Sequence, residues 1–371
     1  MTRPIYLDYA ATTPLDPAVL DAMLPWLAER FGNPHSPHLW GYEADAAVEV
    51  ARGQVAALLG VAAATIAFTG GATESVNWVL KGVMTAPGQT RRRLVTLATE
   101  HSCVLETARW LESVGCALTV IGVRPDGIVD LDILAAAMGD DVALVSAMLV
   151  NNETGVIQPV AAIAAIAHAA GALMHCDAAQ GLGKVDCIGL GVDLLSLTAH
   201  KIYGPKGIGA LYRRAGVAMT PLLHGGGQED GRSGTLSPAL CVGLGTAAAL
   251  AAQRMAVDAA HARTLWDRLL AGIGVPVRVN GSMTDRWFGT ANLGFPGVDP
   301  ARLFAAVRDL AVSTGSACAS ASGRPSHVLA AMAGAIPGLR LGWGRFTTAA
   351  EIDTSAAVLT AAAQRLGAKA A

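Results

Sequence analysis

A lysine and an aspartate each follow a short apolar run that is typical of a buried strand. Lys201 comes just after residues 194–198, and Asp177 ends the run of residues 171–177. The carboxyl ends of parallel strands meet at one edge of an open sheet, where α/β proteins bind their ligands. A partly desolvated lysine amine can form an imine with an aldehyde, and a carboxylate can keep a pyridine nitrogen protonated. Alone, a lysine after a strand is most often a solvated loop residue, but paired with this aspartate it predicts a pyridoxal phosphate site.

The residues around this pair carry a longer and more specific pattern. His-x-Asp-Ala-x-Gln at 175–180 is followed by Ser-x-Thr-Ala-His-Lys-x-Tyr-Gly-Pro-Lys-Gly at 196–207. The pattern resembles the fold-type I pyridoxal phosphate enzymes of aminotransferase class V, and within them the cysteine desulfurases of the NifS/IscS type. The resemblance runs from Tyr6 to about Glu351. It implies an α/β fold, with a large domain built on a mostly parallel sheet covered by helices and a smaller α+β domain.

The cofactor residues follow from matching these motifs position by position. The resemblance implies that Lys201 holds the cofactor as an imine and moves protons, while Asp177 protonates the ring nitrogen. It places the His101 imidazole flat against the ring, with a role in proton transfer, and it gives Asn152 and Gln180 contacts with the ring oxygen.

A phosphate cradle is predicted where Gly70-Gly71 precedes a helix. Glycines let the backbone approach a ligand, and the free N–H groups of a helix start favour an anion. The resemblance assigns the phosphate contacts to Ala72, Thr73, Thr198, His200 and Thr235. The last of these ends the glycine-rich segment 224–235, which is one residue shorter than is usual in the family. In relatives this threonine reaches the phosphate of the neighbouring subunit, so a homodimer is expected.

Of the six cysteines, at 103, 116, 176, 187, 241 and 318, only Cys318 lies outside apolar surroundings. The other five are expected to be small core residues. Cys318 stands in a run of small residues, and a mobile loop is predicted at about 313–325. Alone, this run would be a flexible linker with an incidental cysteine. Its match to Ser-x-Gly-Ser-Ala-Cys-x-Ser implies instead that Cys318 takes the sulfur of L-cysteine as a persulfide and releases L-alanine.

Two further residues are candidates for binding the substrate carboxylate. Arg340, in a segment that matches the family's Arg-x-Ser-x-Gly-Arg, is the predicted bidentate clamp. Asn33 is the second candidate, although an Asn-Pro turn explains it equally well.

Composition narrows the classes of function. Hydrophobic residues make up 52% and charged residues 15% of the 371, with a formal net charge of −2. The lack of a polybasic run argues against nucleic acid or an anionic membrane as partner. The start lacks the apolar core of a signal peptide, so a cytoplasmic protein is expected. No metal is expected, because His175, Cys176 and His200 lack ligand spacing.

Two domains are predicted from the order of elements. Apolar strands alternate with Ala-rich helices from about 44 to 212, which indicates a large domain at 15–250. A long helix at about 239–270 then leads to shorter elements. The small domain is therefore assigned residues 1–14 and 251–371, including the loop that carries Cys318.

Two other functions stay open at this point. Another class V enzyme, such as an aminotransferase or a selenocysteine or sulfinate lyase, would need Lys201 but not Cys318. The second alternative is an inactive paralogue that acts as a sulfur-relay or assembly partner, and the intact Lys201, Asp177 and His101 argue against it. The sulfur acceptor is open as well: an iron–sulfur scaffold protein, thiolated tRNA or another carrier. Longer relatives carry a C-terminal extension that helps dock a scaffold.

Overall fold

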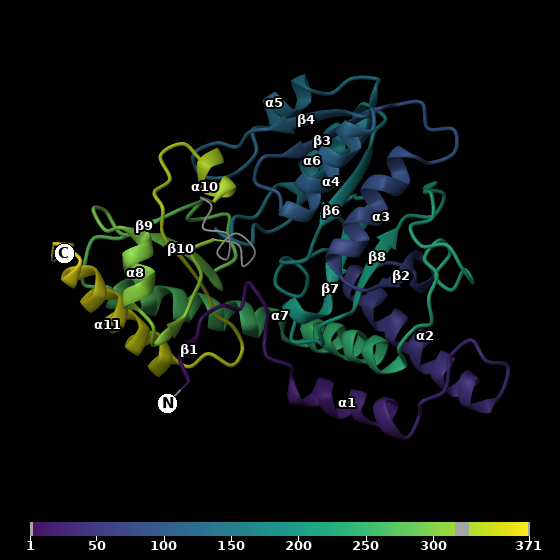
Figure 1. Cartoon of the computed structure of the whole chain (residues 1–371), viewed down its shortest axis with the longest axis horizontal. Coiled ribbons are helices and arrows are strands. Elements are labelled where there is room, and N and C mark those ends of the chain that lie inside the picture. The colour runs from purple at the N-terminus through teal and green to yellow at the C-terminus, as the bar shows by residue number, and fades with distance from the viewer. Residues whose placement is uncertain (1–2, 316–325, 370–371) are drawn as a thin grey trace.

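A computed structural model describes residues 3–315 and 326–369 (Figure 1). Its central feature is a seven-stranded sheet with the strand order β2-β8-β7-β6-β5-β3-β4. The strands are β2 (Ile66–Thr69), β3 (Arg93–Leu97), β4 (Ala117–Ile121), β5 (Val142–Met148), β6 (Leu173–Asp177), β7 (Leu194–Thr198) and β8 (Gly209–Arg213).

The interior strands are mostly apolar and are buried along almost their whole length, because helices cover the sheet on both faces. Every residue of β5 and β7 is buried. The predicted mostly parallel sheet is confirmed. One strand is an exception, since β8 lies between β2 and β7 and pairs antiparallel with both.

Two apolar clusters mark the two faces of the sheet. On one face, α3 (Ala72–Met84) and α4 (Ser102–Ser113) pack on the strands with a cluster that contains Trp78 and Leu111. On the other face lie α2 (Leu39–Leu59), α5 (Leu131–Ala136) and α6 (Val160–Ala169). The connections include the short helices η1 (Ala63–Thr65) and η2 (Ala199–Lys201).

The C-terminal part forms a second, smaller unit. Three antiparallel strands pair in the order β12-β10-β9, and β1 pairs parallel with β11. This pairing joins the N-terminal segment to the C-terminal unit. The elements are β1 (Ile5–Tyr6), β9 (Arg278–Val279), β10 (Thr290–Gly294), α8 (Pro300–Ala306), β11 (Leu310–Ala311), α10 (His327–Ala331), β12 (Leu339–Gly342) and α11 (Ala349–Arg365).

One helix joins the two parts. α7 (Pro238–Gly272) is continuous, so it runs straight through the predicted domain boundary at residue 250. By length and composition alone it is apolar enough to cross a membrane. It packs along α2, α1 (Pro17–Ala28) and α11, however, as the core helix of a globular protein does (Figure 1).

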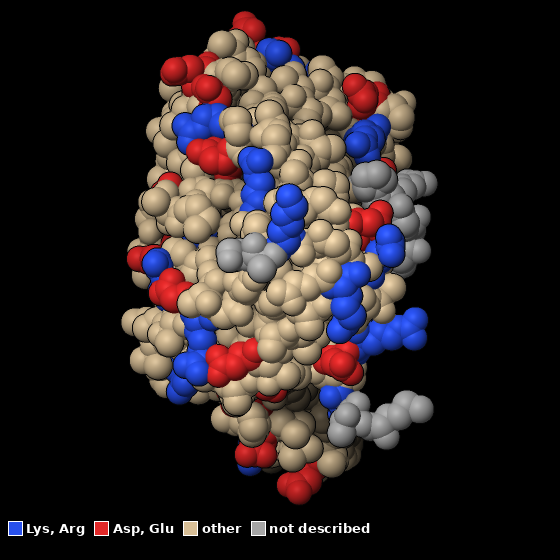
Figure 2. All heavy atoms as spheres, turned by 90° about the vertical axis from the view of Figure 1, so that its left-hand side faces the viewer, with Lys and Arg blue, Asp and Glu red and all other residues tan. Residues whose placement is uncertain are grey.

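Charge is mixed on the face of the C-terminal unit. Figure 2 shows acidic and basic side chains interspersed over this face, with wide uncharged areas between them. This distribution matches the small formal net charge of −2. Such a face lacks the single-sign field that attracts nucleic acid.

Candidate active site

The carboxyl ends of β5, β6 and β7 and the first turns of α3 and α4 open onto one cavity of about 830 Å³. This volume lies in the ordinary range for a small-molecule site. Ten of the predicted site residues line the cavity: Ala72, Thr73, His101, Asn152, Asp177, Gln180, Thr198, His200, Lys201 and Arg340.

Lys201 lies in η2, directly after β7. Its amine donates hydrogen bonds to the backbone carbonyl oxygens of Ala10 and Ala11, the second at 2.6 Å. The N-terminal segment therefore forms the wall of the cavity beside Lys201.

Asp177 ends β6 with its side chain buried. Its Oδ1 accepts a hydrogen bond from the Ala179 N–H at 2.9 Å. Burial raises the pKa of this carboxyl, while that N–H and the neighbouring His101 and Lys201 act in the opposite direction. A buried carboxylate on this wall is stabilised by a cation or a protonated ring nitrogen that pairs with it.

His101 caps the start of α4. Its Nδ1 accepts a hydrogen bond from the Cys103 N–H at 3.2 Å, so in the neutral ring the proton sits on Nε2. Burial lowers the pKa of His101, and Lys201 and His327 lower it further. The imidazole is therefore neutral near pH 7 and can take up a proton.

The first turn of α3 forms the anion-binding end of the cavity. Gly71 precedes the helix with φ of 147°, a conformation that side chains with a Cβ rarely adopt. The backbone of the turn is thereby laid open to the cavity beside the hydroxyls of Thr73 and Thr198. His200, whose Nδ1 lies 3.1 Å from the Thr12 Oγ1, completes this end; burial lowers its pKa to about 4.

Arg340 lines the cavity from β12 with only 1% of its surface exposed. Its Nη2 donates to the Asp8 Oδ1 at 2.7 Å, and its Nη1 lies 3.4 Å from the Asn152 carbonyl oxygen. Its buried Nε has no hydrogen-bond partner among the described residues. An anionic ligand in the cavity would find a guanidinium there that is only partly engaged.

Two of the predicted residues that the structure describes do not line this cavity. Asn33 is exposed, and its Oδ1 accepts a hydrogen bond from the His35 N–H at 3.0 Å. This bond is typical of a turn, which is the second explanation given above for Asn33. Thr235 is exposed and does not line the cavity of its own chain. Cys318 lies outside the described residues.

Two described residues that precede and follow the Cys318 segment in sequence, Gly315 and Ser326, lie near Glu153, the neighbour of Asn152. The Ser326 hydroxyl donates to the Glu153 Oε2 at 2.6 Å. Glu153, next to Asn152 in sequence, thus fixes the position of Ser326.

The structure also reveals site residues that the motifs did not predict. Cys103 was expected in the core but lines the cavity, 3.1 Å from the His101 Nδ1; burial raises the pKa of its thiol, which therefore stays protonated. Glu74 lines the cavity one residue after Thr73. Cys103 could have been predicted to line the cavity, because it follows His101 by two residues at the start of a helix.

The residues fit pyridoxal phosphate. An amine and a buried carboxylate share one cavity with a glycine turn at a helix start, and these three features match the aldehyde, the ring nitrogen and the phosphate of that cofactor. Lys201 would hold the aldehyde carbon, Asp177 the ring nitrogen, and Ala72, Thr73, Thr198 and His200 the phosphate.

Comparisons with known proteins agree with this fit. The family model described as aminotransferase class V matches residues 5–354. A protein named cysteine desulfurase IscS from Rickettsia bellii (strain OSU 85-389) is 49% identical over 363 residues, covering 94% of this chain and 88% of its own length.

Solved structures show the same similarity. A structure titled NifS-like protein has a TM-score of 0.90 at 35% identity and covers 98% of this chain and 99% of that one. Another, titled SspA in complex with cysteine, has a TM-score of 0.83 at 34% identity and covers 93% and 100%.

Proposed function

We propose a residue-level mechanism for this chain, which belongs to the aminotransferase class V family and, within it, to the cysteine desulfurases, enzymes that use pyridoxal phosphate. It converts L-cysteine to L-alanine and leaves the sulfur on Cys318 as a persulfide. The observation that carries the mechanism is the placement of Lys201 and Asp177 on one cavity with the glycine turn of α3.

Each residue of the cavity has a separate task. When bound, pyridoxal phosphate supplies an electron sink next to the substrate α-carbon. Lys201 attaches the cofactor and afterwards moves protons at that carbon. Arg340 binds the substrate carboxylate with its guanidinium. His101, neutral near pH 7, lines the cavity and is assigned a role in proton transfer.

Cys318 is the predicted sulfur acceptor. Its thiolate attacks the sulfur of the substrate, so that an S–S bond forms as the C–S bond breaks. The electron pair of the broken bond stays with the substrate carbon, which is protonated to give L-alanine. Support comes from the match of the residues around Cys318 to Ser-x-Gly-Ser-Ala-Cys-x-Ser and from the similarity to proteins named cysteine desulfurase.

The test compares two single variants of the purified holoenzyme. Cys318→Ala should keep the visible absorbance of the bound cofactor and lose sulfide release from L-cysteine in the presence of a reductant. Lys201→Ala should lose both, because it lacks the amine that attaches the cofactor. Cys187→Ala, a buried thiol outside the cavity, is the matched control and should behave like the wild type.

Two results would contradict the proposal. Desulfuration retained by Cys318→Ala would favour another class V reaction. A wild type that stays colourless after addition of pyridoxal phosphate would favour an inactive sulfur-relay protein.

We further propose a cytoplasmic homodimer that passes its sulfur to an iron–sulfur scaffold or another carrier protein. The exposed Thr235, which lies outside the cavity of its own chain, supports a contact with a second subunit. Exposed apolar side chains on α1 and the start of α2 offer a surface for it: Leu20, Leu24, Leu27, Leu39, Trp40 and Tyr42. Light scattering on the purified protein should give twice the mass of one chain, and a single-chain mass would refute the dimer.

The sulfur carrier needs a separate experiment. Proteins that take up ³⁵S from the persulfide of the labelled enzyme should be captured and identified as the carrier.

A further inference from the structure

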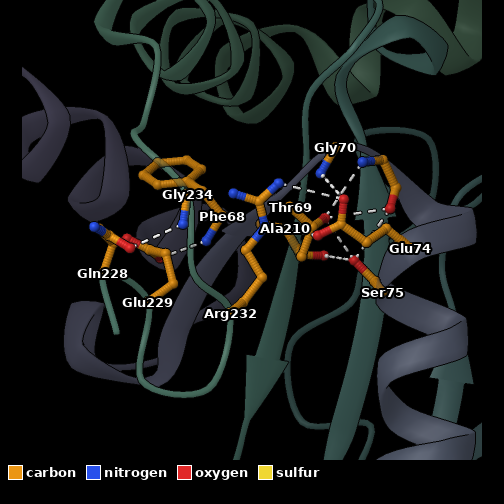
Figure 3. A network of polar contacts seen from close by, with 11 residues as sticks. Phe68, Thr69, Gly70, Glu74, Ser75, Ala210, Gln228, Glu229, Arg232 and Gly234 are labelled. Carbon is orange, nitrogen blue, oxygen red and sulfur yellow. Dashed lines mark hydrogen bonds and ion pairs between the residues drawn. The ribbon is translucent and has the colours of Figure 1, made fainter. Parts of the chain in front are cut away.

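The glycine-rich segment 224–235 contacts the phosphate turn of the same chain from outside the cavity. Figure 3 shows two of its side chains, Glu229 and Arg232, reaching toward β2 and the start of α3, which flank Gly70 and Gly71. The segment therefore touches the turn on both sides, although about 160 residues separate the two in sequence.

Glu229 fixes the strand before the turn. Its carboxylate is buried and accepts hydrogen bonds from the Phe68 N–H at 2.6 Å and from the two terminal nitrogens of Arg52 at 2.7 and 2.8 Å. A carboxylate that is paired with a guanidinium in two parallel bonds has a fixed orientation. Phe68 and the segment are thereby locked together.

Arg232 acts on the turn itself, through Glu74. The Glu74 Oε2 accepts the Gly70 N–H at 2.9 Å, and its Oε1 accepts from the Arg232 Nε at 2.7 Å (Figure 3). Both side chains are largely buried, with exposed fractions of 16% for Arg232 and 23% for Glu74. A Cβ at position 70 would stand 2.7 Å from the Glu74 Oε2, so the contact needs a glycine there.

The charge of Glu74 has the wrong sign for its surroundings. Glu74 lines the same cavity as Ala72 and Thr73, where the cofactor phosphate is expected. An unpaired carboxylate repels a phosphate dianion at this range. Arg232 offsets that charge and leaves Glu74 free to hold the Gly70 N–H, which fixes the backbone of the turn next to Ala72 and Thr73.

We propose that Arg232 is a positioning residue for the cofactor phosphate, which acts by neutralising Glu74 at the Gly70–Gly71 turn. The inference rests on the proposed function, because it needs pyridoxal phosphate in the cavity. It adds a second role to the segment that carries Thr235: the segment also supports the phosphate site of its own chain.

The test measures how fast the holoenzyme loses its cofactor. Arg232→Met should release pyridoxal phosphate about tenfold to a hundredfold faster, as expected when a charge-assisted contact is lost. The double variant Arg232→Met/Glu74→Gln should recover most of the wild-type retention, because the unpaired negative charge is gone. Arg213→Met, which breaks an ion pair with the exposed Asp230 of the same segment, is the matched control and should match the wild type.

The single variant Glu74→Gln tests the same inference independently, and it can be used if Arg232→Met does not fold. It leaves Arg232 positive beside the phosphate, so cofactor retention should equal or exceed that of the wild type. A purely structural brace predicts the reverse, with faster loss from Glu74→Gln and no recovery in the double variant, and either result would overturn the inference. Hydrogen exchange should in addition rise at residues 68–74 in Arg232→Met but not in Arg213→Met.

Failure of the proposed function gives a different result. A wild-type protein that holds no pyridoxal phosphate refutes the function itself. A wild type that holds it, with Arg232→Met losing it no faster than Arg213→Met, refutes only the role of Arg232.

Discussion

Arg340 combines burial, charge and incomplete pairing, which is the combination that suits a ligand-binding residue. Its Nη2 is held by Asp8, whereas its buried Nε is unpartnered among the described residues. A buried guanidinium without full pairing is costly, and an anion that completes its hydrogen bonds relieves that cost. A substrate carboxylate is such an anion.

Arg340→Lys should raise the KM for L-cysteine about tenfold to a hundredfold, because lysine cannot form the paired bonds of a guanidinium. The cofactor absorbance should stay unchanged, since no phosphate or ring contact is assigned to Arg340. Steady-state kinetics with L-cysteine provide the measurement. Arg124→Lys, at an exposed ion pair with Asp126, is the control. An unchanged KM in Arg340→Lys would exclude the clamp.

At the scale of elements, strand β6 carries a polar residue into the middle of the sheet. The His175 side chain is fully buried, with Nδ1 2.8 Å from the Ser146 Oγ on β5 and Nε2 2.9 Å from the Ser196 Oγ on β7. Burial lowers its pKa to about 3. The neutral ring thus links β5, β6 and β7 two residues before Asp177. This linkage holds the carboxyl end of β6 in place.

The depressed pKa of His175 predicts an acid-sensitive fold. Below about pH 6.5 the unfolded chain binds a proton at this histidine while the folded chain does not. This contribution to stability is complete above about pH 6.5 and is lost as the pH falls toward 3, with a slope of up to about 1.4 kcal/mol per pH unit.

Urea unfolding at several pH values between 4 and 7 measures this slope. His175→Gln should give a shallower loss of the free energy of unfolding than the wild type, because glutamine does not titrate. His224→Gln, on an exposed loop, should leave the wild-type slope unchanged. Equal slopes in all three proteins would contradict the assignment.

At the scale of the whole molecule, Arg345 joins three distant parts of the chain. Its guanidinium bonds Asp16 near the start of α1 at 2.6 Å and Asp258 on α7 at 2.8 Å, and it lies 4.2 Å from the centre of the Tyr203 ring. All three charged side chains are nearly buried. Arg345 therefore ties the C-terminal unit to α7 and to the N-terminal segment.

Arg345→Met should lower the free energy of unfolding by about 3–5 kcal/mol, because the buried Asp16 loses its counter-charge and Asp258 keeps only the longer ion pair with Arg254 at 3.4 Å. Urea unfolding at pH 7 gives the measurement. Arg268→Met breaks the exposed ion pair between α7 and Asp353 and should cause no measurable change. Equal effects of the two changes would show that burial does not decide the strength of these pairs.

The sequence alone predicted most of the residues that line the cavity and the type of sheet that carries them. Apolar runs that end in Asp177, Asn151-Asn152 and Lys201 predict parallel strands, and parallel strands present their carboxyl ends along one edge. The reaction type rests on Cys318, which the motif identifies and which lies outside the described residues. These inferences depend on local patterns, and a short stretch of sequence contains all the residues that form such a pattern.

Only the tertiary structure decided the contacts between segments far apart in sequence. It showed three sets of hydrogen bonds: Arg340 with Asp8, Lys201 with the carbonyl oxygens of Ala10 and Ala11, and Arg232 with Glu74. It moved Cys103 from the expected core to the cavity and left Asn33 outside the cavity. Such contacts depend on how the helices and the sheet pack around a common core. The spacing of residues along the chain does not show which residues from distant segments will be in contact.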